Sequence, residues 1–188
     1  MRWVTEIGRK AIHLSAILIP IGYYFTSEEV GRRILLILTA IVFLIDVVRL
    51  NQPRVRKLFF IFFGRLVRDH ERYNLLGATY VLLSSVLCVH IFEKPVAVAA
   101  LSFLIVGDSM AALVGKSIGR VHIFGKTLEG SLACLLVCVV IGLIIPGMGW
   151  TRTLVGAATA TLVELLPVPL DDNLRIPLAA GFAMMAVP

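Results

Sequence analysis

The fold is decided by residues 96–114, which read VAVAALSFLIVGDSMAALV. This stretch has a single charged side chain, Asp108, and approaches the roughly 20 apolar residues that a helix needs to cross a bilayer. Further apolar runs lie on either side of it, at residues 11–25, 34–50, 75–92, 130–145, 153–166 and 176–187. We therefore predict an all-α fold: a polytopic membrane helix bundle of about seven transmembrane helices. It would form a single integral membrane domain over residues 1–188.

The composition agrees with a membrane protein. Apolar residues make up 59% of the 188 residues and charged residues 16%, whereas soluble globular proteins contain about 45–50% and about 25%. These values exclude a disordered chain, a collagen-like repeat and an ordinary soluble domain. The three cysteines lie inside apolar runs, and Cys134 and Cys138 are four residues apart on one predicted helix, away from any His or carboxylate that could complete a zinc site. We interpret them as small helix-packing residues.

The positive charge, +6 overall, is unevenly distributed along the chain. If the N-terminus is cytoplasmic, the inner segments hold fourteen of the 18 Lys and Arg residues and the outer segments hold four. Cytoplasmic loops of membrane proteins are enriched in Lys and Arg, so this distribution predicts a cytoplasmic N-terminus and an outer C-terminus. We attribute the charge to orientation and expect no nucleic-acid partner. The short chain favours a prokaryotic plasma membrane.

Residues 54–72 differ from the apolar runs on either side of them. They contain the apolar stretch LFFIFF at residues 58–63, with basic residues before and after it. This pattern predicts a helix lying in the inner membrane interface, in contact with membrane lipids. Two roles remain open for it, an anchor and a guide for a lipid substrate. Just before it, Asp46 and Arg49 have the spacing of a structural pair on one helix.

Asp108 is an acid without a partner in its local sequence. No cation lies three or four residues away from it, and small residues follow at helical spacing: Ala111, Ala112, Gly115 and Gly119. An ionisable group inside a membrane span costs about 2.5–3.5 kcal/mol on insertion scales, so this carboxylate needs a partner. A hard cation such as Mg²⁺ would meet the need. The structural alternative is a protonated Asp108 bonded to a neighbouring helix.

A stretch rich in glycine, cations and hydroxyl groups follows, GKSIGRVHIFGKTLEGS at residues 115–131. Glycine backbone N–H groups and Lys or Arg side chains bind phosphates. The next helix begins near Glu129, and its N-terminus also favours an anion. The predicted phosphate-binding residues are Lys116, Arg120, Gly125, Lys126, Thr127, Gly130 and Ser131. A solvated loop at the inner face is the alternative.

Acidic residues gather again near the end of the chain. Pro167 and Pro169 fix an extended turn, which ends in Asp171, Asp172 and Asn173. Their oxygen atoms suit Mg²⁺, and adjacent acids repel each other unless a cation is nearby. Capping of the following helix is the alternative for one of the three.

Two further polar positions belong with these clusters. Glu164 lies at the inner end of its predicted helix, where the negative end of the helix dipole disfavours it, so we expect a cationic partner. Near the N-terminus, Glu6, Arg9, Lys10 and His13 share one helix face. For His13, structural and functional interpretations remain equally open.

All these clusters are predicted at the inner membrane face. Together they hold carboxylates for a metal, cations and glycines for phosphates, and apolar helices for a lipid tail. Phosphoryl transfer needs mainly positioning and charge neutralisation, without a covalent nucleophile. The inventory therefore suits transfer of a phosphoryl group from a nucleotide to a lipid alcohol.

At these residues the sequence resembles a known family. The motifs are ExxRKxxH at residues 6–13, GDSxAAxxGxxxGR at 107–120, KTxEGS at 126–131 and ExxPxPxDDN at 164–173. In this order, from Glu6 to about Gly181, they resemble the membrane-embedded polyprenol and diacylglycerol kinases, which include dolichol kinase, phytol kinase and CTP-dependent diacylglycerol kinase. The resemblance implies CTP as donor, Mg²⁺ as cofactor, and a polyprenol-type alcohol or diacylglycerol as acceptor. The loop between Gly119 and Lys126 is shorter than in the longer members, which leaves the choice between CTP and ATP open.

We assign roles on this basis. Asp108 and Asp172 would hold Mg²⁺, with Asp171 as an alternate ligand. The triphosphate would be contacted by Lys116, Arg120, Lys126, Arg9 and Lys10 and by backbone N–H groups of residues 125–131. The base that accepts the lipid hydroxyl proton would be Glu164 or Glu129, and Asn173 and His13 would orient these groups.

Two other functions use the same kinds of residue. A phosphatidate cytidylyltransferase acts on the same lipid and nucleotide classes with Mg²⁺. A small transporter could use intramembrane acids, although its polar residues would lie near the midplane rather than at one face. The sequence leaves open whether the bundle is a monomer or a homodimer.

Overall fold

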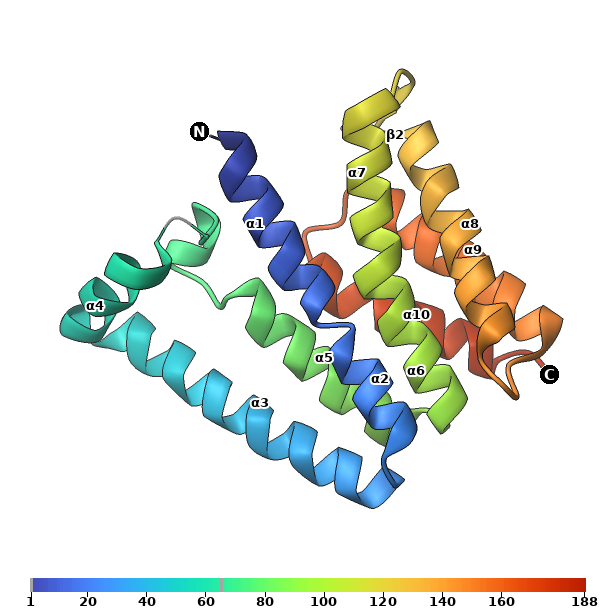
Figure 1. Cartoon of the computed structure of the whole chain (residues 1–188), viewed down its shortest axis with the longest axis horizontal. Coiled ribbons are helices and arrows are strands. Elements are labelled where there is room, and N and C mark those ends of the chain that lie inside the picture. Colours follow the sequence, from blue (N-terminus) through green and yellow to red (C-terminus); the bar gives the residue numbers. More distant parts are fainter. Residues whose placement is uncertain (1, 65) are drawn as a thin grey trace.

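The computed structural model describes residues 2–64 and 66–188, without the side chains of residues 2–7, 9 and 70. The chain is predominantly helical, as predicted (Figure 1). The α-helices are α1 (Arg2–Ser15), α2 (Leu18–Phe25), α3 (Glu28–Asn51), α4 (Pro53–Phe63), α5 (Gly77–Ile91), α6 (Lys94–Ser102), α7 (Asp108–Ile118), α8 (Leu128–Ile144), α9 (Gly149–Leu165) and α10 (Asp172–Met185). Two shorter helical turns are η1 (His70–Arg72) and η2 (Phe103–Gly107). The strands β1 (His122–Ile123) and β2 (Lys126–Thr127) form a small antiparallel hairpin that the all-α prediction did not include.

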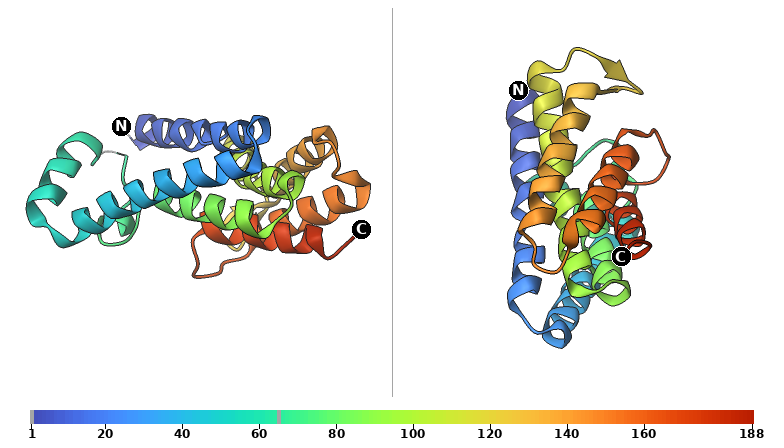
Figure 2. Two further views of the ribbon diagram at one scale, coloured as in Figure 1. Left: turned by 90° about the horizontal axis from the view of Figure 1, so that it is seen from below. Right: turned by 90° about the vertical axis from the view of Figure 1, so that its right-hand side faces the viewer.

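The long apolar stretch over residues 96–114 lies at the centre of the molecule. Helix α6, the π-helical turn η2 and helix α7 form one continuous helix, Lys94–Ile118, of 25 residues. Most of its first half is fully buried, including Leu101, Phe103 and Leu104. Figure 2 shows α1 and α2 on one side of this helix and α9 and α10 on the other. A π-helical turn inside an α-helix is rare and is frequent at functional sites, and this one ends directly before Asp108.

The predicted span over residues 11–25 is broken into two helices. Around the break, the backbone N–H groups of Ala16, Ile17 and Ile19 bond to carbonyl groups three residues earlier. Pro20 explains the break, because proline has no N–H and its ring clashes with the carbonyl group four residues before it. The predicted run is therefore apolar and helical but interrupted at Ala16, where it bends.

Helix length supports fewer spans than predicted. Within the described residues, α3 and the continuous helix Lys94–Ile118 are long and apolar enough to cross a bilayer. The segments Lys10–Phe25, Gly77–Ile91 and Leu128–Ile144 are apolar but shorter. Seven spans are therefore not established by the structure.

The predicted interfacial helix is also shorter than expected. Helix α4 ends at Phe63, and the chain continues through a turn and η1 before α5 begins at Gly77. In Figure 1, α4 lies across the end of α3, at the left of the molecule. Its aromatic residues pack against cations, with the guanidinium carbon of Arg49 5.3 Å from the ring centre of Phe59. The helix over residues 54–72 is thus corrected to Pro53–Phe63.

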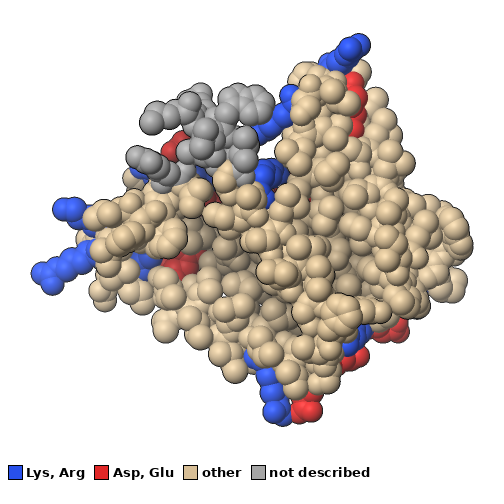
Figure 3. Space-filling model, viewed as in Figure 1, with Lys and Arg blue, Asp and Glu red and all other residues tan. Residues whose placement is uncertain are grey.

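The outer surface is unusually apolar. On the face in Figure 3, most charged side chains gather at the margins, and the band between them is largely uncharged. Large apolar side chains point outward along α3 and α8, among them Ile37, Leu44, Leu136 and Ile144. Extended apolar patches of this kind mark surfaces that contact a membrane or a partner.

Candidate active site

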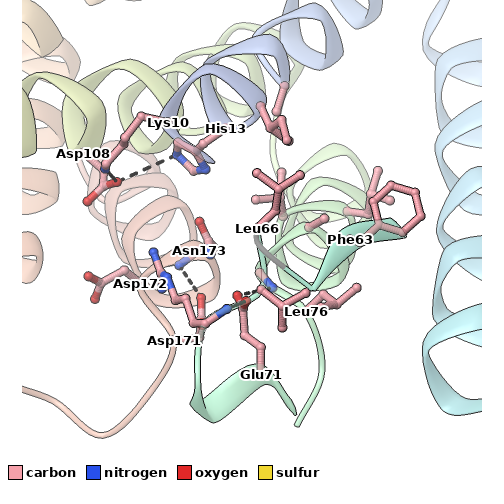
Figure 4. Close-up of a pocket in the computed structure, with 18 of the residues that line it drawn as sticks. Lys10, His13, Phe63, Leu66, Glu71, Leu76, Asp108, Asp171, Asp172 and Asn173 are labelled. Carbon is pink, nitrogen blue, oxygen red and sulfur yellow. Dashed lines mark hydrogen bonds and ion pairs between the residues drawn. The ribbon is translucent and has the colours of Figure 1, made fainter. Parts of the chain in front are cut away.

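A cavity of about 630 Å³ lies between α1, α4, α5, α7 and the start of α10 (Figure 4). Its charged and polar lining residues come from distant parts of the chain: Lys10, His13, Arg68, Glu71, Asp108, Asp171, Asp172 and Asn173. The remaining lining is mostly apolar and includes Ala16, Ile19, Phe63, Val81 and Leu82. A cavity of this size suits a small ligand, and its mixed walls suit one with a polar head and an apolar tail.

Asp108 forms an ion pair with a cation from another helix. The Nζ atom of Lys10, on α1, lies 2.8 Å from Oδ2 of Asp108, although the two residues are 98 positions apart. The Nε2 atom of His13 lies 3.9 Å from the same oxygen and has no hydrogen-bond partner among the described atoms. The Asp108 side chain is 20% exposed. Asp108 is therefore paired, yet it still faces the cavity beside an imidazole nitrogen that has no partner among the described atoms.

The turn before α10 brings three further polar residues to the cavity. Asp171 caps α10, because its Oδ1 accepts a bond of 2.9 Å from the backbone N–H of Asn173. The capping alternative is thus confirmed for Asp171. Asp172 accepts a bond of 2.7 Å from Nε of Arg175. In Figure 4, these residues lie across the cavity from Lys10, His13 and Asp108.

Lys126 connects the hairpin to α9 and α10. Its Nζ lies 2.8 Å from Oε1 of Glu164 and 3.3 Å from Oδ2 of Asp172. The buried Glu164 also contacts the Ser131 hydroxyl, at 3.5 Å. The predicted cationic partner of Glu164 is therefore confirmed as Lys126. Glu164 itself is not among the residues that line the cavity.

Glycines of the predicted phosphate cradle have clear structural roles. Gly125 occupies the hairpin turn with a φ of 83°, a conformation that favours glycine. Gly130 allows α8 to approach α7, since a Cβ atom there would lie 2.5 Å from the carbonyl oxygen of Ala111. The Thr127 hydroxyl caps α8 by accepting from the N–H of Gly130 at 3.2 Å. Turn geometry and helix packing therefore account for these glycines without a phosphate.

The other predicted residues lie around the hairpin or outside the described set. Lys116 and Arg120 are exposed at the end of α7. Both carboxylate oxygens of Glu129 lie 3.3 Å from the backbone nitrogen of Val121. The pKa of Glu129 is lowered, first by its own backbone N–H and then by those of Arg120 and Val121. Glu129 thus stabilises the hairpin, and it is not among the residues that line the cavity. The predicted side chains of Glu6 and Arg9 lie outside the described residues.

Glu71 lines the cavity, although the sequence analysis did not single it out. Its carboxylate accepts bonds from the backbone N–H groups of Arg68, at 2.7 Å, and Gly77, at 3.0 Å. A Cβ atom on Gly77 would lie 3.1 Å from Glu71 and 3.3 Å from Asn173, so these two side chains flank the start of α5. The sequence feature that could have indicated Glu71 is its place as an acidic residue at the end of the basic, aromatic segment over residues 54–72.

The carboxylates of the cavity also decide whether a metal fits. Among the described residues, no group of three or more His, Cys, Asp and Glu side chains is placed to hold a metal ion. Mg²⁺, however, is usually held by one or two carboxylates together with substrate phosphates and water. Asp108, Asp171 and Asp172 line one cavity and offer oxygen atoms of the required kind. The residues present therefore fit this mode of binding.

Comparison with known proteins gives relatives along most of the chain. No family model matches the chain, and no solved structure matches it. An uncharacterized protein of Rickettsia prowazekii is 30% identical over 184 residues, which cover 93% of this chain and 90% of that protein. The CTP-dependent diacylglycerol kinase 1 of Saccharomyces cerevisiae is 27% identical, over 97% of this chain and 73% of the yeast protein.

A plant relative extends this set. The probable chloroplastic phytol kinase 1 of Glycine max is 33% identical over 61% of this chain, a match that spans 45% of the plant protein. The resemblance found in the sequence motifs is therefore confirmed. The chain belongs to the lipid kinase family that contains the CTP-dependent diacylglycerol kinases and the phytol kinases.

Proposed function

We propose that this protein is an integral membrane lipid kinase. It transfers the γ-phosphoryl group of CTP to a polyprenol-type alcohol or diacylglycerol, with Mg²⁺ as cofactor. One observation carries the proposal: side chains from α1, α7 and the start of α10 form the polar end of a cavity whose other walls are mostly apolar. The kinase relatives, a CTP-dependent diacylglycerol kinase and a probable phytol kinase, support the donor and the class of acceptor.

The proposed setting is a multi-pass protein in a prokaryotic plasma membrane, with a cytoplasmic N-terminus and one domain over residues 1–188. The apolar outer surface and the two long apolar helices support this setting. The N-terminus and the hairpin lie at the same end of the bundle (Figure 1), and the charge distribution favours the cytoplasm for that end.

The reaction joins the lipid hydroxyl oxygen to the γ-phosphorus of the nucleotide. The bond from that phosphorus to the bridging oxygen breaks, CDP leaves, and the hydroxyl proton passes to a base. Asp108 and Asp172, with Asp171 as an alternate, would hold Mg²⁺. When bound, the ion supplies positive charge against the phosphate oxygens. Lys10 and Lys126 add further positive charge at the same end, where Asn173 lies.

The apolar walls would hold the hydrocarbon chain of the acceptor. Ala16 and Ile19 approach from the α1–α2 side, and Val81 and Leu82 from α5. Burying a methylene group there stabilises the complex by about 0.8 kcal/mol. The hydroxyl group would thereby be directed to the polar end.

The proton acceptor needs reassignment. Neither Glu164 nor Glu129 lines the cavity, and both carboxylates are engaged elsewhere. We assign the acceptor to the lining itself, to His13, whose Nε2 lies 3.9 Å from the Asp108 carboxylate at the polar end. A catalytic base must come within hydrogen-bond reach of the proton that it removes.

The experiment is a phosphoryl-transfer assay with purified protein in lipid vesicles. CTP and ATP, each labelled at the γ-phosphorus, are offered with a panel of polyprenols, phytol and diacylglycerol. We expect label in the lipid, with CTP preferred. Labelled pyrophosphate, with CMP joined to phosphatidate, would instead identify a cytidylyltransferase, and solute transport without nucleotide turnover would identify a transporter. Either result would overturn the proposal.

A further inference from the structure

The tip of the hairpin holds an aromatic residue in a conformation that disfavours it. Phe124 and Gly125 connect β1 to β2 with φ angles of 51° and 83°. Positive φ at both central residues is the requirement of a type I′ turn, for which Asn-Gly is the preferred pair. For a residue with a Cβ atom, the left-handed backbone conformation is less stable than the right-handed one by about 1–2 kcal/mol. The Phe124 side chain is 67% exposed, so burial does not offset this cost.

The hairpin is held in a fixed position. The backbone N–H of Leu128 donates to the carbonyl oxygen of Val121 at 2.9 Å. The Val121 N–H faces the Glu129 carboxylate, and the buried Thr127 packs beside Gly115 and is also the cap of α8. The tip is therefore presented by a rigid support, as a preorganised binding element would be.

The hairpin also connects directly to the cavity end of the molecule. Lys126, two residues after Phe124, reaches Asp172 at 3.3 Å, and Asp172 lines the cavity. Lys116 and Arg120 are exposed near the base of the hairpin. An exposed ring beside several cations has the chemistry that binds a nucleotide, with stacking for the base and positive charge for phosphates.

We propose that Phe124 stacks against the base of the nucleoside triphosphate that this lipid kinase uses. The inference rests on the proposed function and adds a subsite for the part of the nucleotide remote from the reacting phosphorus. Because every base has an aromatic face, stacking supplies affinity with little choice between bases. Phe124 thus strengthens binding of CTP and ATP alike, and selection of CTP comes from other contacts.

A membrane anchor is the competing role for an exposed apolar tip. Ile118 and Val121 are already 64% and 49% exposed next to the hairpin, and neither has a positive φ. An anchor could use these residues without backbone strain, whereas a stacking ring must occupy one particular place. The strained position of Phe124 therefore favours the nucleotide.

The deciding variant is Phe124→Asn. It removes the ring and creates the Asn-Gly pair that a type I′ turn prefers, so the hairpin is retained. We expect the KM for CTP and for ATP to rise about tenfold, while the KM for the lipid alcohol stays at the wild-type value. Phe124→Tyr keeps a ring and should restore the KM for nucleotide. Val121→Thr, an exposed change on the same hairpin, serves as the matched control.

Equilibrium dialysis with labelled CTP and Mg²⁺ measures the same effect without a lipid acceptor. An unchanged affinity in Phe124→Asn, in an active protein, would overturn this inference and leave the proposed kinase intact. A raised KM for the lipid alone would identify the anchor instead. If the wild-type protein binds no CTP, the proposed donor fails first and the stacking subsite fails with it.

Discussion

Two acids of this molecule lie in apolar helices but in opposite circumstances. Asp46, on α3, is 1% exposed and accepts bonds from Nε of Arg49 at 2.7 Å, the N–H of Leu76 at 2.7 Å and the hydroxyl of Thr79 at 2.8 Å. Asp108, at the start of α7, is bound by Lys10 from a distant helix and faces a cavity. An acid whose oxygens are used by fixed neighbours supports the fold, whereas one that borders a cavity is free to exchange its partner for a ligand.

The surroundings of Asp46 and of Asp108 are nevertheless connected, through Arg49. Arg49 is fully buried and also donates to the backbone carbonyl groups of Glu71, at 3.1 Å, and Asn74, at 2.8 Å. The Glu71 side chain lines the cavity that contains Asp108. The ion pair of α3 therefore holds the segment before α5 in place, and that segment forms part of the cavity wall.

The largest effect is expected from Asp108→Asn. The change keeps the size of the side chain but removes the charge that faces the cavity, so we expect turnover to fall about a thousandfold or more, since charge stabilisation dominates this chemistry. Phosphoryl transfer per folded molecule is the measurement. The melting temperature should remain close to that of the wild type. A fully active Asp108→Asn would remove the proposed metal site.

Asp46→Asn is the matched control and should behave in the opposite way. It leaves Arg49 buried without its countercharge, and breaking a buried ion pair costs about 3–5 kcal/mol. Thermal unfolding in detergent should show a large loss of stability. The molecules that remain folded should lose far less turnover than Asp108→Asn does, because Asp46 does not itself line the cavity. The contrast between the two acids would be lost if Asp46→Asn melted like the wild type.

Whether each ion pair could be predicted from the sequence depends on how far apart its two partners lie along the chain. Asp46 and Arg49 are predictable because they are three residues apart on one helix. The cation of Asp108 was not predictable, because Lys10 belongs to another helix and no local spacing connects them. For Glu164 the need for a cation followed from the helix dipole, while the identity of that cation, Lys126, depended on the hairpin.

The hairpin and the cavity walls were missed for other physical reasons. The hairpin has Phe-Gly where the recognisable signal is Asn-Gly or Asp-Gly. The π-helical turn before Asp108 adds a residue to a helical turn without changing the apolar composition of the stretch. Residues 54–72 were predicted as one helix, which hid the turn that brings Glu71 to the cavity. Apolar composition predicts burial or membrane contact, but it does not predict where helices leave a space.

A third variant tests the space beside Asp108. Ala16→Phe places a large ring at the bend between α1 and α2, on the apolar wall of the cavity. Activity with long-chain alcohols should fall about tenfold relative to short-chain alcohols, because the ring occupies volume that the chain would fill. Ala158→Phe, at an exposed position of α9, is the control. An equal loss with both chain lengths would argue against a tail-binding cavity.

The smallest effect is expected from Glu129→Gln, which extends the comparison to a half-buried acid outside the cavity. Its carboxylate braces the hairpin and does not line the cavity, so turnover should stay within about twofold of the wild type, as for most surface substitutions. The pKa of Glu129 is lowered in the folded protein. Its contribution to the hairpin is therefore present above the ordinary pKa range of Glu and is lost as the pH falls through the lowered value.

The pH dependence separates the two roles considered for Glu129. As a brace, it would make the KM for CTP rise in acid in the wild type, and Glu129→Gln would show less of this rise because its amide does not titrate. As the catalytic base, it would make turnover itself fall in the variant at every pH. Steady-state kinetics from neutral pH down to below the ordinary pKa range of Glu distinguish these outcomes, and a collapse of turnover at neutral pH would return Glu129 to the reacting centre.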